Sequence, residues 1–169
     1  NYLNLPTLVS GPNNFRLRYG YDGGGRKWSV LHEPAPTGSP SQRTWYLGEV
    51  EMDGANLTRL STPEGQALNR NNQYEYQYYL SDHLGNVRAV LEQTGSVAYT
   101  NGYYPYGLSY APTVGTGSNE ANRYQYNGKE VQVGVGWLDY GARMYNAAIG
   151  RWNGVDALSE KWNVVSPYG

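Results

Sequence analysis

The chain has 169 residues, which suits one domain of ordinary size, and its 13 basic and 14 acidic side chains leave a formal net charge of -1. This balance offers no electrostatic attraction to nucleic acid or to an anionic membrane. With no cysteine and only two histidines, the sequence also excludes disulfides, thiolate metal sites and histidine-rich metal centres, and no cofactor or metal is expected.

The aromatic composition is unusual, with 18 tyrosines and 5 tryptophans against a single phenylalanine, together with 22 glycines. Rings with polar tips, separated by glycine, favour half-exposed β-structure. The mean hydropathy of -0.69 and the lack of a long apolar run predict that no segment inserts into a membrane. Because no leader pattern and no initial Met are visible, Asn1 is expected to be an internal position of a longer chain.

Periodicity predicts strands from the beginning of the chain. In segment 14–21, Phe15, Leu17, Tyr19 and Tyr21 alternate with polar or small residues, which is the pattern of a half-buried strand. Similar strands, bounded by Gly, Pro, Asn or Asp, are predicted at 44–50, 73–80, 86–91, 96–106 and 123–126. We expect surface loops at 33–42 and 111–121, a mobile polar segment at 61–72, and helical turns only at 142–149 and 156–162.

An internal repeat relates two parts of the chain. Asp22 and Asp82 each begin an Asp-x-x-Gly turn, and residues 29–33 align with 89–93 at the same offset of 60 residues. The Asp side chain can accept a backbone hydrogen bond two residues on, and Gly can adopt positive φ, so each copy predicts a β-hairpin. Asn127-Gly128 predicts a third hairpin with a type I′ turn. Stacked hairpins that bury their faces against neighbours are typical of a repeat array.

Several motifs then occur in a recognisable order. The segment Tyr21-Asp22-Gly23-Gly24-Gly25-Arg26 fits the Tyr-Asp-x-x-Gly-Arg signature of YD repeats, also called RHS repeats. The further motifs are Asp-His-Leu-Gly-Asn-Val-Arg at 82–88, Tyr-Tyr-Pro-Tyr-Gly at 103–107, Tyr-Gln-Tyr-Asn-Gly-Lys-Glu at 124–130, Trp-Leu-Asp-Tyr-Gly-Ala-Arg-Met-Tyr at 137–145 and Ile-Gly-Arg-Trp-Asn-Gly-Val-Asp at 149–156. Over most of its length the chain resembles the RHS repeat-associated core domain in its Bacteroidetes-like version.

The resemblance implies an all-β fold of antiparallel hairpin repeats that forms part of a YD-repeat β-shell, with short helical turns near the C-terminus. It divides the chain into repeat strands and hairpins at 1–110, a surface loop at 111–121 and an RHS core closing or plug segment at 122–169. It implies a structural role, as wall and closing segment of a secreted or surface-delivered bacterial shell that encapsulates a C-terminal toxin. The expected partners are the remainder of the parent RHS chain and, beyond it, a toxin domain or secretion machinery.

The resemblance also raises an enzymatic alternative, because the family's core carries a self-cleaving aspartyl protease. That activity uses the Asp of an Asp-Pro-x-Gly motif and a second Asp further along. Here Asp156 is followed by Ala157, Tyr145-Asn146-Ala147 replaces the earlier Tyr-Asp-Pro, and no Asp follows Asp156. Asp156 is therefore only a weak catalytic candidate, better explained as the N-cap of a short helix, and we expect the chain not to be an enzyme.

Two groups of residues are predicted to carry the structural role. The turn and repeat residues are Tyr21, Asp22, Gly25, Arg26, Asp82, Gly85, Arg88, Asn127 and Gly128. The core or plug residues are Trp137, Tyr140, Arg143, Tyr145, Gly150, Arg151 and Trp152. We expect the segment 137–152 to be buried as a plug, with Tyr99 on an exposed strand, and the arginines near turns to stack on rings and pair with carboxylates.

A binding role is the remaining alternative. Exposed rings such as Trp28, Trp45, Tyr78 and Tyr79 could stack on sugars or on a partner, which would make the chain a carbohydrate- or partner-binding cell-surface module. In a repeat wall, the same rings would instead form ladders between adjacent strands. The neighbouring Asp82 and His83 could similarly suggest an acid-base dyad, but a turn role for Asp82 is favoured because neighbours on a strand point to opposite faces.

Overall fold

The computed structural model describes residues 4–11, 14–33, 41–114 and 122–156, together with 159, 166 and 168. Within these ranges the chain is all-β, as the sequence predicts. The strands of the first sheet are β1 Leu8–Ser10, β2 Arg16–Tyr21, β3 Lys27–Glu33, β4 Gln42–Leu47, β5 Val50–Asp53, β6 Asn56–Thr62, β7 Gly65–Arg70, β8 Gln73–Ser81, β9 Val87–Glu92, β10 Val97–Tyr103 and β11 Ser109–Val114. After them come the 3-10 turn η2 Tyr126–Gly128 and strands β12 Glu130–Gln132, β13 Trp137–Asp139, β14 Met144–Asn146 and β15 Arg151–Trp152.

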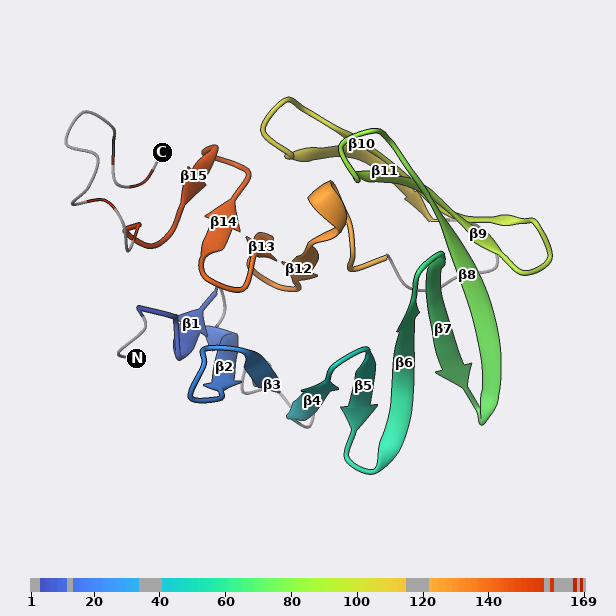
Figure 1. The fold of residues 1–169 in the computed structure, drawn as a ribbon, viewed down its shortest axis with the longest axis horizontal. Coiled ribbons are helices and arrows are strands. Elements are labelled where there is room, and N and C mark those ends of the chain that lie inside the picture. Colours follow the sequence, from blue (N-terminus) through green and yellow to red (C-terminus); the bar gives the residue numbers. More distant parts are fainter. Residues whose placement is uncertain are drawn as a thin grey trace.

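The topology is a simple meander. Strands β1 to β11 form one 11-stranded sheet in sequence order, and β12 to β15 form a 4-stranded sheet in the same manner. Figure 1 shows that the large sheet curls along its length and that the small sheet lies on its concave side. We refer to residues 122–156 as the closing segment. Among the described residues, none belongs to a helix with the length and hydropathy of a membrane span.

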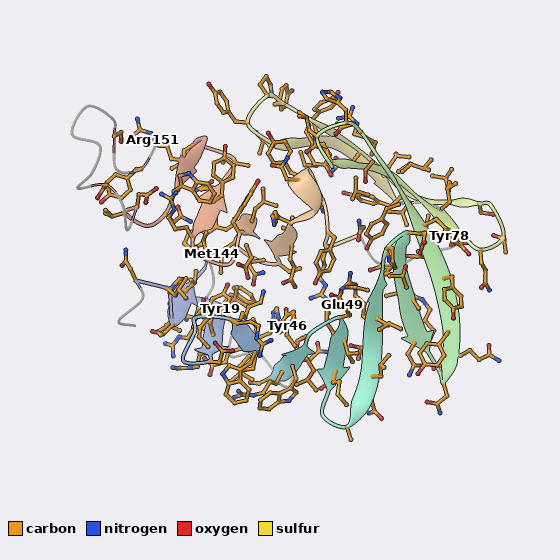
Figure 2. All side chains as sticks on the ribbon, viewed as in Figure 1. Tyr19, Tyr46, Glu49, Tyr78, Met144 and Arg151 are labelled. Atoms are coloured by element: carbon orange, nitrogen blue, oxygen red, sulfur yellow. The ribbon has the colours of Figure 1, made fainter. Side chains whose placement is uncertain are left out.

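Alternation within the strands decides which side chains enter the core. On β2, Leu17 and Tyr19 are buried while Arg16 and Arg18 are exposed, so one face packs and the other meets solvent. Leu17 and Tyr19 join Val9, Val30 and Met144 in one buried cluster, and Val87, Val90, Ala98 and Tyr99 form a second. Met144, on β14, brings the closing segment into the first cluster (Figure 2).

Four expectations about local structure need correction. Residues 61–72 lie largely in β6 and β7, because the backbone of this polar segment pairs with neighbouring strands; Gln66 is buried, while Ser61, Thr62 and Asn69 are half-buried. The loop expected at 111–121 is strand β11 as far as Val114. The segment 142–149 contains β14 instead of a helical turn, since pairing with β13 and β15 overrides its modest helix propensity. Segment 123–126 has one bridge, Tyr124 to Glu130, before η2.

Some expectations fall outside the described residues. These are the loop residues 34–40 and 115–121, and most of the helical turn expected at 156–162. In that last segment, the Ser159 N–H donates to the Asp156 carbonyl oxygen at 3.0 Å.

Candidate functional site

The YD motif forms the hairpin turn that its residues predict. The Asp22 N–H donates to the Arg26 carbonyl at 2.9 Å, and the Gly25 N–H donates to the Asp22 carbonyl at 3.0 Å. The Asp22 carboxylate accepts from the N–H groups of Gly24 and Arg26 and pairs with the Arg26 guanidinium at 3.1 Å. These bonds, led by the Arg26 backbone N–H, lower the pKa of Asp22. Gly25 has a φ of 84°, which glycine adopts without strain.

The second copy of the repeat reproduces this turn. The Asp82 N–H donates to the Asn86 carbonyl and the Gly85 N–H to the Asp82 carbonyl, with Gly85 at a φ of 77°. The Asp82 carboxylate accepts from the Leu84 and Asn86 N–H groups, so Asp82 is a turn residue, while His83 is exposed. An Asn86 side chain takes the place of the arginine and donates to Asp82 at 2.9 Å.

The third turn attaches the closing segment to the large sheet. Asn127 and Gly128 both have positive φ, and the Lys129 N–H donates to the Tyr126 carbonyl at 3.0 Å, as the predicted type I′ turn requires. The Asn127 N–H donates to Asn86 Oδ1 at 2.9 Å, and its Oδ1 accepts from the Tyr140 hydroxyl at 2.6 Å. The turn thus ties the Asp82 hairpin to the small sheet.

The remaining two turn residues, Tyr21 and Arg88, also make contacts with other parts of the chain. The Tyr21 hydroxyl donates to the Pro6 carbonyl at 3.1 Å, which joins β2 to the segment before β1. Arg88 lies over the Tyr103 ring at 5.6 Å, in agreement with the expected arginine stacking.

A continuous set of buried and half-buried charges joins the closing segment to the large sheet. Glu130 and Asp139 lie within the motifs at 124–130 and 137–145, but those motifs do not indicate which charges meet. We call this set the ionic seam; its members are Lys27, Glu51, Arg59, Arg123, Glu130 and Asp139. Lys27, Glu51 and Arg59 come from strands β3, β5 and β6, whereas Arg123, Glu130 and Asp139 belong to the closing segment. The seam therefore crosses the interface between the two sheets more than once.

Lys27 is the centre of the first half of the seam. Its Nζ lies 2.6 Å from Glu130 Oε2 and 2.6 Å from Asp139 Oδ2, and the three side chains are 11%, 7% and 9% exposed. Burial alone would lower the Lys27 pKa, but the two carboxylates outweigh it and raise that pKa. The Tyr46 hydroxyl donates to Glu130 Oε1 at 2.8 Å, and its ring lies 4.4 Å from the Lys27 Nζ. Tyr46 lies on β4 and is labelled in Figure 2.

Glu51 is the centre of the second half. Its Oε1 accepts from Arg59 Nη1 and from the Tyr124 hydroxyl, both at 2.7 Å, while its Oε2 pairs with Arg123 Nη2. Arg123 Nη1 reaches Glu130 Oε1 at 2.9 Å, so this arginine joins the two halves. The Arg59 guanidinium lies 3.7 Å from the centre of the Tyr124 ring.

The polar chain continues beyond the seam along the concave face of the large sheet. Arg59 Nε donates to Gln66 Oε1 at 2.6 Å, and Gln66 Nε2 donates to Gln77 Oε1 at 2.6 Å. Both glutamines are buried. One face of four successive strands, β5 to β8, is thus lined by Glu51, Arg59, Gln66 and Gln77. The sequence could predict that these side chains meet only if the pairing of the strands were already known.

Two cavities border the seam. One of about 370 Å³ is lined by Arg59, Gln66 and Arg123 among others, and one of about 420 Å³ is lined by His32, Glu51 and Arg123 among others. Burial, together with the positive charge of Arg123, lowers the pKa of His32, so this imidazole stays neutral near pH 7.

The charge state of the seam suits cohesion better than proton transfer. Although burial raises the pKa of Glu130, the cations Lys27 and Arg123 outweigh it and lower that pKa. Glu130 is therefore ionised near neutral pH and is unsuited to act as a general acid. Removing either partner of such a pair would leave an uncompensated buried charge. The intact pairs therefore favour the arrangement in which the two sheets are docked together.

The expected plug is a half-buried aromatic cluster and not a fully buried core. The rings of Tyr140, Tyr145 and Trp152 meet edge to face with centroids 5.0 to 6.0 Å apart, and Arg143 lies 4.4 Å from the Trp152 ring. All four are partly exposed, as is Trp137. The expectation that these side chains are buried is thus wrong, since they are only half-buried. The reason is that the small sheet covers only one side of the rings.

Individual residues of this region differ further from expectation. Ile149 is 63% exposed, and Arg151 is exposed on β15 (Figure 2). Gly150, at a φ of 63°, lies against the Tyr106 ring. Tyr99, expected on an exposed face, is only 2% exposed, since β10 directs it into the second buried cluster.

Asp156 and three of the four aromatic residues proposed for stacking make contacts within the chain. Asp156 pairs with Arg143 at 2.8 Å. Trp28 and Trp45 contact each other across β3 and β4 with ring centroids 4.9 Å apart, as the ladder interpretation expects. Tyr79 points inward and its hydroxyl donates to Asn122 Oδ1 at 3.0 Å, whereas Tyr78 is 45% exposed.

Comparison with known proteins relates this architecture to toxin chains. No family model matches the chain. A stretch of 101 residues is 37% identical to Salivary gland surface protein 1 of Aedes aegypti, covering 59% of this chain and 3% of that protein.

Solved structures give a broader match. The crystal structure of TcdB2-TccC3 without its hypervariable C-terminal region superposes with a TM-score of 0.73 and 24% identity, over 88% of this chain and 8% of that one. TcdB2-TccC3-Cdc42 gives 0.73 and 23%, over 89% and 9%. A Tc holotoxin pore from Photorhabdus luminescens gives 0.69 and 24%, over 87% and 8%. The fold of this chain is therefore RHS-like, matching a short stretch of the much longer TcdB2-TccC3 chains.

Proposed function

We propose that the chain is a wall and closing segment of an RHS shell that encapsulates a toxin located C-terminal to it in the parent protein. Residues 1–110 would supply wall strands and residues 122–169 the closure. The likeness to TcdB2-TccC3 supports a shell role, and the family motifs in the sequence support the Bacteroidetes-like core as the specific version. The proposed setting is secreted or at the cell surface, with the rest of the parent chain as first partner.

One observation carries this proposal, namely the ionic seam that fastens the closing segment across the concave face of a curled sheet. Lys27 reaches residues 103 and 112 positions away, and Glu51 reaches Arg123, 72 positions away. A wall that only needed to be stable could bury apolar side chains instead, since buried ion pairs contribute little net stability. Charged pairs of this kind specify one docking position, which is what a closure requires.

Proteolysis of the parent protein tests encapsulation. We would incubate the full parent chain with trypsin and follow, by mass spectrometry, the cleavage of the sequence that follows residue 169. Encapsulation predicts slow cleavage in the unmodified protein and fast cleavage when Lys27→Met and Arg123→Met disrupt the seam.

Arg18→Met is the matched control, because Arg18 pairs with Glu33 at the surface with 48% of its side chain exposed. This variant should leave the protection unchanged. Equal cleavage rates for the downstream sequence in the unmodified and seam-disrupted proteins would refute encapsulation.

We further propose that the chain performs no self-cleavage. The pairing of Asp156 with Arg143 at 2.8 Å supports this, since the ion pair occupies the carboxylate that would have to take part in the cleavage. The mass of the purified chain should stay at 18.9 kDa on prolonged incubation between pH 4 and 8. A cut that appears in a longer chain and disappears in Asp156→Ala, but not in Asp22→Ala, would show that the protease assignment is right.

A further inference from the structure

The hairpin that joins β10 to β11 carries two tyrosines in contact with each other at the surface. Strand β11 is the last of the large sheet and pairs with β10 (Figure 1). The ring centroids of Tyr104 and Tyr110 are 4.9 Å apart, and the ring planes are inclined at 53°. The two residues are 55% and 44% exposed. We call them the surface tyrosine pair.

Gly102 makes room for this contact. It lies opposite Tyr110 in the strand register, two residues before Tyr104. The Tyr110 ring crosses over this glycine, because a Cβ on Gly102 would lie only 2.5 Å from Tyr110 Cζ. The ring is thereby directed along the diagonal toward Tyr104, where aromatic side chains of adjacent strands can meet. The hairpin backbone is fixed by hydrogen bonds from the Tyr104 N–H to the Leu108 carbonyl at 2.9 Å and from the Gly107 N–H to the Tyr104 carbonyl at 2.8 Å.

The other tyrosine pairs among the described residues differ in distance and in hydrogen bonding. Their ring centroids are 5.6 to 6.2 Å apart. In each of them at least one hydroxyl donates to an oxygen of the chain, as the Tyr103 hydroxyl does to the Val87 carbonyl at 2.9 Å. Neither hydroxyl of the surface tyrosine pair forms a hydrogen bond with another described residue. The two phenols are therefore accessible to reagents in solution, and the fold makes no use of their hydroxyl groups.

We propose that the surface tyrosine pair is a site of oxidative cross-linking, at which Tyr104 and Tyr110 become joined as dityrosine. The oxidant is hydrogen peroxide acting through a haem peroxidase. The cross-link ties β11, which ends the large sheet, covalently to β10. This modification is independent of shell closure, because none of its residues belongs to the ionic seam.

The chemistry of the cross-link balances with one peroxide per link. Each phenol gives up one electron and one proton and becomes a phenoxyl radical. The two radicals form a carbon–carbon bond between ring carbons ortho to the oxygens, and the hydrogens on those two carbons move to the oxygens as the rings regain aromaticity. The two electrons and two protons reduce one hydrogen peroxide molecule to two water molecules.

Contact between the rings makes this product selective. Coupling requires two radicals to meet, and two rings already held in contact react within one molecule instead of waiting for an encounter between molecules. Tyr106 lies between the two tyrosines in the sequence and is 68% exposed, but no ring of a described residue pairs with it. Exposure alone therefore does not distinguish Tyr104 and Tyr110 from Tyr106, whereas contact does.

The test treats a dilute solution of the 169-residue chain with a haem peroxidase and hydrogen peroxide, followed by trypsin digestion and mass spectrometry. Trypsin releases residues 89–123 as one peptide, because no Lys or Arg lies between Arg88 and Arg123. We expect this peptide, taken from monomeric protein, to be lighter by two hydrogen atoms and to show dityrosine fluorescence. Because the link closes a ring, backbone breaks between residues 104 and 110 should release no separate fragments.

Two variants and their controls distinguish a positioned pair from general oxidation. Tyr104→Phe should lose the product, since phenylalanine keeps the ring but cannot form a phenoxyl radical, whereas Tyr106→Phe should retain it. Gly102→Ala keeps both phenols but displaces the Tyr110 ring, and it should lower the yield severalfold. Gly23→Ala is its matched control, because a Cβ at Gly23 meets no atom within 4 Å. Melting temperatures measured before oxidation show that each variant is folded.

Several results would overturn the proposal. These are a loss of two hydrogen atoms that occurs only in covalent dimers, a product that persists in Tyr104→Phe, and fragment ions that place the link at another pair of tyrosines. Equal yields from Gly102→Ala and the unmodified chain would overturn it as well, because contact between the rings would then not select the pair.

Discussion

At the scale of single residues, Lys27 shows how much one buried charge can determine. It stands directly after the YD turn, on β3, and its ammonium group pairs with two carboxylates of the closing segment. Nothing adjacent to it in the sequence indicates this role, because both partners lie more than a hundred residues away. The YD turn thus positions the residue that pairs with the closing segment.

We predict that Lys27→Met destabilises the chain by about 3–5 kcal/mol, since it removes the ammonium partner of the buried Asp139 carboxylate and leaves Glu130 paired with Arg123 alone. Arg18→Met, which removes only a surface pair, should cost less than about 1 kcal/mol. Urea unfolding followed by tryptophan fluorescence measures both. Equal losses for the two variants would mean that the seam contributes no more than a surface ion pair.

Two aromatic residues exchange the roles that sequence patterning assigns to them. Tyr99→Ala should cost about 3–5 kcal/mol, because Tyr99 is fully enclosed in the second buried cluster. Trp152→Ala should cost less, because Trp152 is partly exposed and loses only one-sided packing. The same urea titration compares them. A larger loss for Trp152 than for Tyr99 would restore the buried-plug interpretation.

At the scale of elements, one turn design recurs along the chain. In each case an N–H bonds to the carbonyl four residues on, and a glycine with positive φ follows, at Gly25, Gly85, Gly95, Gly107 and Gly128. Type I turns followed by such a glycine are common three-residue hairpin connections, whereas the turn at Gly128 is of type I′ because Asn127 also has a positive φ. The turns at Gly25 and Gly85 add an aspartate that accepts further backbone hydrogen bonds, which is the physical content of the YD signature.

Replacement of the turn glycine tests this design. Gly85→Ala should cost about 1–2 kcal/mol, because a residue with a Cβ is strained at a φ of 77° even though there is open space around it. Gly23→Ala, in the first turn and without positive φ, should change stability by less than about 0.5 kcal/mol. Thermal melting distinguishes the two, and a neutral Gly85→Ala would show that the turn can relax.

At the scale of the whole molecule, the buried charges and tyrosines set the pH range of stability. Glu130 has a lowered pKa, so its contribution is present above about pH 4.5 and is lost as the pH falls further. Burial raises the pKa of Tyr99 to about 12, and the pKa values of Tyr46 and Tyr124 are also raised. For these phenols, and for Lys27, stability is fully present below the unfolded pKa and is lost as the pH rises past about 10.

We therefore predict a melting temperature that is nearly constant between about pH 6.5 and 9 and that falls on both sides of this range, beginning on the acid side with His32, whose folded-state pKa is lowered by burial. Glu130→Gln should be less stable than the unmodified chain at pH 7, with the difference shrinking as the pH falls below 4.5, where the unmodified carboxyl also becomes neutral. Differential scanning calorimetry across pH 3–11 measures this. A difference that stays constant down to pH 3 would show that Glu130 contributes through packing and not through charge.

The sequence alone determined the all-β class, the antiparallel hairpins and the turns at Asp22, Asp82 and Asn127. These features depend on hydrogen bonds and backbone angles within about five residues, so a local pattern contains all the information they need. Only the tertiary structure decided which strand faces are buried, as Tyr99 shows, and which charges meet, as Lys27 and Glu130 show. Such contacts depend on the curl of the sheet and on where the closing segment lies across it, and no short stretch of sequence specifies either.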